Sequence, residues 1–138
     1  MSAAEDLIAE AYAVRKSGDA AGGLRGYMAA VDALREMDEP LRLAHTVRHV
    51  ADIQRGIGEL EAARANYAEA LAIYRAEPGT GKLDLANTLR GYGLLLEQMG
   101  ENAAATAMWR EAGALYAAVG VQVGVDEADR RVSLLNTD

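Results

Sequence analysis

The feature that most constrains this chain is a turn that recurs three times at nearly constant spacing. Gly18-Asp19-Ala20, Gly58-Glu59-Leu60 and Gly100-Glu101-Asn102 lie 40 and 42 residues apart. Each turn separates two long stretches rich in Ala, Leu and Arg, which favour the α-helix. Glycine suits the left-handed end of one helix, and the polar residue after it suits the start of the next. A chain with this internal period is expected to stack helical hairpins.

The repetition extends beyond the turns. The segment 42–48, RLAHTVR, aligns with the segment 84–90, DLANTLR, at the same 42-residue step, and a third alanine follows at Ala128. Further pairs at this step are Ala63 with Ala105, Ala70 with Ala112, and Tyr74 with Tyr116. Several matches at one offset and at helical spacings indicate true repeats.

The pattern predicts an all-α chain, because no segment shows the strict alternation of a strand. We expect one domain over residues 1–138, built from three helix-turn-helix repeats at about 3–37, 39–76 and 83–119. Within the repeats, the expected helices cover about 3–17, 20–37, 39–56, 59–76, 83–99 and 102–119. A last helix at about 126–135 is expected to cap the array.

Small residues flank an aromatic residue on each second helix. Tyr67 lies between Ala63 and Ala70, and Trp109 takes the same place in the third repeat. This spacing places the three side chains on one helix stripe. We therefore predict that Trp109 is buried.

On these residues the chain resembles the tetratricopeptide repeat family, whose mark is a helix-turn-helix with this stripe on the second helix. Gly93 and Ala51 also lie where the family has a small residue on the first helix. The 40–42-residue step is similar to repeats of kinesin-light-chain type and of many bacterial regulatory proteins. The resemblance implies a right-handed superhelix, an α-solenoid, with first helices lining a concave groove. It also implies binding of a peptide or partner protein rather than catalysis.

Composition narrows the class of partner. The chain has 21 acidic and 14 basic side chains and a formal charge of −7, which disfavours nucleic-acid and anionic-membrane binding. There is no cysteine, no stretch as apolar as a membrane span and no signal-peptide pattern at the N-terminus. We expect a cytoplasmic protein without cofactor, and the excess of Arg over Lys suggests a bacterial source.

The predicted groove gathers basic side chains from the first helices. If they face inward, an acidic peptide could bind between Arg48 and Arg90, which occupy equivalent, solvent-facing positions. The opposite possibility is that these arginines pair with Asp52 and Glu97. The predicted lining comprises Ile8, Tyr12, Arg15 and Lys16 from the first repeat, His45, Arg48, His49, Asp52 and Arg55 from the second, and Asn87, Arg90, Leu94 and Gln98 from the third.

A second class of function is self-assembly, since the end helices of a short array can pair with another copy. Glu127, Arg130 and Arg131 would give the last helix a polar outer cap, which favours a monomer or weak homodimer.

Other chemistries are remote alternatives. His45, His49 and Asp52 share one helix face and could bind a metal ion, but Thr46 occupies the position where the metallopeptidase motif has Glu. The loop 77–82, EPGTGK, lacks the first Gly, the hydroxyl residue after Lys and the preceding strand of a phosphate-binding loop. No catalytic constellation stands out.

Overall fold

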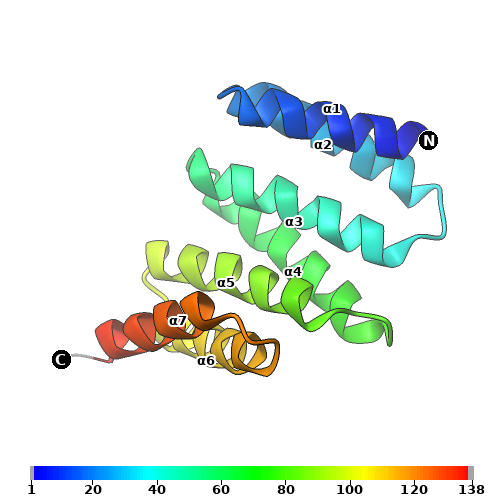
Figure 1. The fold of residues 1–138 in the computed structure, drawn as a ribbon. Coiled ribbons are helices and arrows are strands. Elements are labelled where there is room, and N and C mark those ends of the chain that lie inside the picture. The colour runs from blue at the N-terminus through cyan, green and yellow to red at the C-terminus, as the bar shows by residue number, and fades with distance from the viewer. Residues whose placement is uncertain (1, 137–138) are drawn as a thin grey trace. The chain divides into compact units, whose positions relative to one another are not determined.

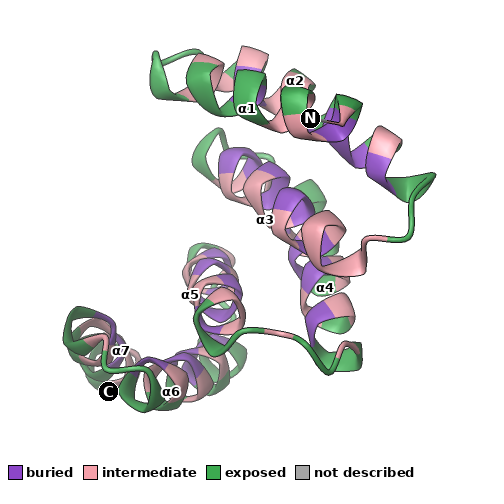
Figure 2. Ribbon diagram, turned by 45° about the vertical axis from the view of Figure 1, so that its right-hand side comes forward, coloured by how far each residue is buried: buried purple, intermediate pink, exposed green. Residues whose placement is uncertain are grey.

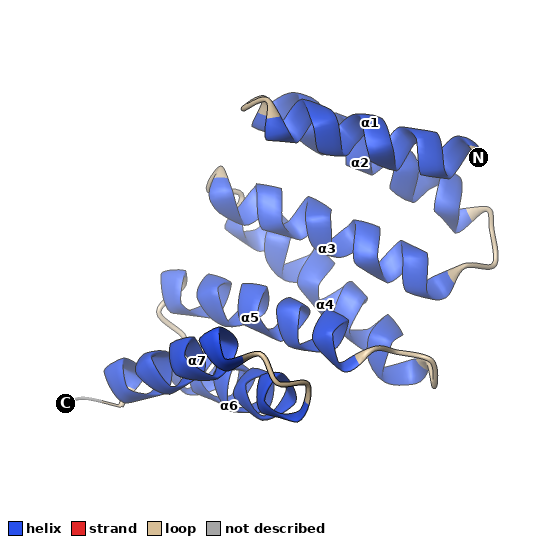
Figure 3. Ribbon diagram, in the orientation of Figure 1, coloured by secondary structure: helices blue, strands red, loops and turns tan. Residues whose placement is uncertain are grey.

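The computed structural model describes residues 2–136, which form seven α-helices joined by short turns (Figure 1, Figure 3). No strand occurs within these residues. The helices are α1 (Ala3–Lys16), α2 (Ala20–Arg35), α3 (Pro40–Gly56), α4 (Leu60–Ala76), α5 (Lys82–Gln98), α6 (Asn102–Ala118) and α7 (Gln122–Leu135). The predicted all-α repeat architecture is therefore confirmed.

The chain divides into two compact units. Unit 1 ends at Glu77 and holds α1–α4, and unit 2 begins at Pro78 and holds α5–α7. Within unit 1, α2 packs against both α1 and α3, and α3 packs against α4. Within unit 2, α6 packs against both α5 and α7. The segment 77–81 connects α4 to α5, so a helix precedes it, as the sequence predicts.

The recurrent glycines end helices in the left-handed conformation. Gly18, Gly58 and Gly100 have φ of 101°, 85° and 76°, where a side chain would be strained. Gly120 repeats this geometry with φ 77° at the end of α6. Ser2 caps α1 by accepting a hydrogen bond from the Glu5 N–H at 3.1 Å.

Small residues let the helices of a pair approach closely. A Cβ built on Gly26 of α2 would lie 2.8 Å from the Cβ of Ala11 in α1. In the next helical turn, Gly23 faces Arg15, so the two helices run antiparallel. The buried positions lie on one side of α2, α4 and α6 and cover a broader face of α3 and α5 (Figure 2).

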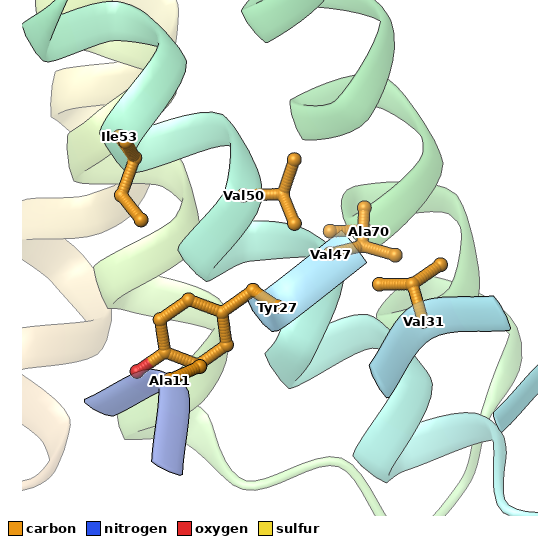
Figure 4. Close-up of a cluster of buried hydrophobic side chains, with 7 residues drawn as sticks. All are labelled: Ala11, Tyr27, Val31, Val47, Val50, Ile53 and Ala70. Carbon is orange, nitrogen blue, oxygen red and sulfur yellow. The ribbon is translucent and has the colours of Figure 1, made fainter. Parts of the chain in front are cut away.

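Each unit has its own apolar cluster. In unit 1, the cluster joins Tyr27 with small and branched side chains, and its members come from all four helices (Figure 4). The buried members are Ala11, Tyr27, Val31, Val47, Val50, Ile53 and Ala70. In unit 2, Trp109 is fully buried with Leu96, Ala105 and Ala128, as predicted.

The last helix begins four residues earlier than predicted. The segment around Gly124 lies between the predicted helices, and it contains Val121, Val123 and Val125, which are weaker helix formers than Ala or Leu. Packing on α6 overrides this preference, because Gly124 lies against the ring of Tyr116 where a Cβ would clash.

Candidate functional site

The predicted groove residues of unit 1 gather on one face of α1 and α3. Spacings of three and four residues place them on one stripe of each helix. Arg15 Nη1 lies 3.3 Å from His49 Nδ1, which joins the two helices. We call this surface the basic face and define it by Tyr12, Arg15, Lys16, His45, Arg48 and His49.

His49 is the centre of the basic face. Its ring stacks on Tyr27 with centroids 5.0 Å apart and meets His45 edge-on at 4.7 Å. Burial lowers the pKa of His49 to about 3, with further lowering by Arg48, His45 and Arg15. The ring is therefore neutral at neutral pH. Because an arginine can only donate, Nδ1 accepts from Arg15 and the ring proton resides on Nε2.

A second network links α3 to α4 through one carboxylate. Arg48 Nη1 donates to Asp52 Oδ2 at 3.1 Å, and the Tyr67 hydroxyl donates to Asp52 Oδ1. Arg55 Nε donates to the Tyr67 oxygen at 3.1 Å. Burial raises the pKa of Tyr67, and Asp52 adds to the shift. The hydroxyl thus stays protonated and fixes Asp52 as an acceptor.

Arg48 differs from the sequence expectation. It was expected to face solvent, but its side chain is only 13% exposed. Its Nε is buried and has no hydrogen-bond partner among the described residues. The expectation is wrong because the four-residue spacing to Asp52 folds the guanidinium back onto α3.

Tyr12 and Lys16 are the exposed part of the basic face. Tyr12 is 55% exposed, and the Lys16 ammonium lies 5.7 Å from the centre of its ring. An exposed aromatic side chain beside a cation gives the face both an apolar and a charged contact surface. Ile8 is partly buried and packs against the unit 1 cluster instead.

The predicted groove residues of unit 2 have different surroundings. Asn87 accepts a hydrogen bond from the Tyr116 hydroxyl at 2.6 Å. Arg90 forms two hydrogen bonds to Glu127 of α7, at 2.5 and 3.1 Å. Leu94 packs against the Trp109 cluster, and Gln98 is exposed. A joint contact of Arg48 and Arg90 with one ligand spans both units and stays a prediction.

Sequence reasoning missed the role of α7 in unit 2. Glu127 was predicted to lie on an outer polar cap with Arg130 and Arg131. Instead, Glu127 binds Arg90, and Arg131 Nη1 binds Glu97 Oε1 at 3.2 Å. Glu97 also accepts from the indole N–H of Trp109 at 2.6 Å. These partners come from helices far apart in sequence, so no local pattern indicates them.

The remote metal alternative finds no supporting geometry. Within residues 2–136, no group of three or more His, Cys, Asp or Glu side chains is placed to hold a metal ion. His45 and His49 contact each other and Tyr27, while Asp52 is engaged by Arg48 and Tyr67.

Comparison with known proteins identifies the family of this chain. The tetratricopeptide repeat profile matches residues 42–118, more than half of the chain. The chain therefore belongs to the tetratricopeptide repeat family, as the sequence resemblance implied. Such repeats generally mediate protein–protein interaction or scaffolding, and the family is typically non-enzymatic.

Solved structures agree on the fold. The chain is similar to BtubC (BKLC) from P. vanneervenii, with a TM-score of 0.73 and 19% sequence identity. The match covers 98% of this chain and 65% of that one, so the chain spans about two thirds of its length. No curated protein matches the sequence. No helix within residues 2–136 is long and apolar enough to cross a membrane.

Proposed function

We propose that the chain is a protein-interaction module whose basic face in unit 1 binds an acidic segment of a partner protein. The observation that carries this proposal is the uncompensated positive charge on that face. Arg15 bonds to the neutral ring of His49 rather than to a carboxylate. One carboxylate, Asp52, is shared between Arg48 and Arg55, at 3.1 and 3.9 Å.

The negative charge on the rest of the chain favours binding of acidic groups at the basic face over binding of anions elsewhere. The formal charge of −7 gives a molecule that repels polyanions in general while one face attracts carboxylates. Tyr12 adds an aromatic surface for an apolar residue of the same segment.

The test uses exposed positions, since Arg48 is mostly buried. Lys16→Glu reverses a charge on the basic face, and Arg25→Glu makes the same change on an exposed position of α2 as a matched control. Binding of a fluorescent Glu-rich peptide, measured by anisotropy, should weaken several-fold for Lys16→Glu and with added salt. Arg25→Glu should bind as the unchanged chain does. Equal affinity of both variants would refute the basic face as the site.

A further inference from the structure

Unit 1 carries a small apolar hollow between α2 and α4, with α3 as its floor. Its volume is about 150 Å³, a space that accommodates a group of the size of benzene. The valines that line it are buried and lie together in the apolar cluster of unit 1 (Figure 4). The lining comprises Met28, Val31, Asp32 and Arg35 of α2, Val47 and Val50 of α3, and Asn66 of α4.

Short branched side chains leave the floor of the hollow open. Val47 and Val50 are three residues apart, so they lie on one face of α3. At the 42-residue step of the repeat, Leu89 and Tyr92 occupy the corresponding positions, and both side chains are longer than that of valine. The space above the floor is therefore a property of this repeat rather than of the repeat pattern.

The polar groups at the rim of the hollow leave one negative charge unbalanced. Asp32 is exposed and forms no hydrogen bond or ion pair with any described residue. Arg35 is held by Glu69 through hydrogen bonds of 2.7 and 2.9 Å, so its charge is balanced. Asn66 Nδ2 donates to Gln54 Oε1 at 2.7 Å, so Asn66 Oδ1 remains an acceptor. A carboxylate and an amide oxygen beside an apolar space favour a positively charged donor.

We propose that this hollow binds a basic segment of a partner protein, which inserts one apolar side chain between α2 and α4 and places a Lys or Arg beside Asp32. The volume suits a side chain of the size of Leu. Met28 is 48% exposed at the rim, and its flexible side chain can adapt to the inserted group. Ala62 is exposed one helical turn before Asn66 on α4, so the backbone of the segment can approach closely.

The hollow is separate from the basic face. On α3, Val50 is two residues from Arg48, and residues with that spacing do not share a helix face. The basic face is positive and the rim of the hollow is negative, so the two surfaces select partners of opposite charge. Binding at the hollow therefore does not depend on binding of an acidic segment at the basic face.

Methyl NMR of the full chain tests the proposal with two peptides. Both are capped, alanine-based helices with one Leu, and the residue four positions after it is Lys in the first peptide and Glu in the second. At low salt, the Lys peptide should shift the methyl signals of Val31, Val47 and Val50. It should bind about three- to fivefold more tightly than the Glu peptide, the range expected for an exposed ion pair. Added salt should reduce this preference.

Two variants separate the charge from the space. Asp32→Asn should remove the preference for the Lys peptide, whereas Glu10→Gln, the matched change at an exposed position of α1, should retain it. Val31→Leu extends a side chain into the hollow and should weaken binding of both peptides at least about threefold. Circular dichroism confirms that each variant is folded.

Several results would overturn the proposal. These are unchanged signals of the three valines up to millimolar peptide, equal affinity for the two peptides, and a preference for Lys that survives Asp32→Asn. Valine signals that change with the concentration of the chain alone would assign the hollow to a second copy instead. Saturation by phenethylammonium without a response to either peptide would assign it to a free amine.

Discussion

Replacing Trp109 tests how unit 2 is held together. The indole is fully buried among Leu96, Ala105 and Ala128. Its edge also lies against Gly93, where a Cβ would be 3.0 Å from the indole nitrogen. Trp109→Ala should cost about 3–5 kcal/mol, because the pocket cannot collapse around so large a loss. Total stabilities are about 5–15 kcal/mol, so this is a large fraction.

Trp109→Phe separates the two contributions of the ring. It keeps most of the apolar volume but removes the N–H that donates to Glu97 at 2.6 Å. Hydrogen bonds to charged groups contribute about 1.5–3 kcal/mol, so Trp109→Phe should cost about that amount. Glu97 keeps its contact with Arg131, which limits the loss.

Urea unfolding followed by circular dichroism measures both variants. Tyr12→Ala is the control, since this exposed aromatic should cost less than about 0.5 kcal/mol. A Trp109→Ala variant within about 1 kcal/mol of the unchanged chain would refute the packing argument. A Trp109→Phe variant of unchanged stability would refute the contribution of the hydrogen bond to Glu97.

Three further predictions concern packing and charge. Gly26→Ala should destabilise the chain by about 1–3 kcal/mol despite the better helix propensity of Ala, because the new Cβ would crowd Ala11; thermal unfolding decides the sign. The ring signals of His49 should stay constant in an NMR titration from pH 8 to pH 5, since its pKa is lowered to about 3. As the pH falls from 6.5 toward 3, the His49 ring binds a proton in the unfolded state but not in the folded state, so the free energy of unfolding should decline. Arg90→Ala should cost under about 1 kcal/mol, because the pair with Glu127 is partly exposed. The stability difference between this variant and the unchanged chain should be present above pH 4.5 and should vanish as the pH falls through the lowered pKa of Glu127. Urea unfolding at several pH values measures it.

Local sequence rules predicted most of the fold. Glycines at positive φ mark the turns at Gly18, Gly58 and Gly100, and the stripe around Trp109 marks the buried face. Both are short-range signals, because a turn and a helix stripe each depend on residues within a few positions. The start of α7 was missed since Gly124 is there for close packing against Tyr116, which is a tertiary requirement.

The candidate site was predicted less completely. The repeat register placed Arg15, Arg48 and His49 on first helices, and the structure brings these three together. The repeat register could not show that Arg48 folds back onto Asp52, because a long side chain can pair with any of several partners of similar energy. Nor could it show that Arg90 binds Glu127, because that choice depends on where α7 packs.

The most direct test of acidic-segment binding is an NMR titration of the chain with a Glu-rich peptide at low salt. We expect amide and side-chain signals to change on α1 and α3, around Arg15, Lys16 and His49. We expect little change on the exposed face of α2 around Arg25, and loss of the effect at high salt. Signals that change only on α6 and α7, or no changes up to millimolar peptide, would contradict acidic-segment binding by the basic face.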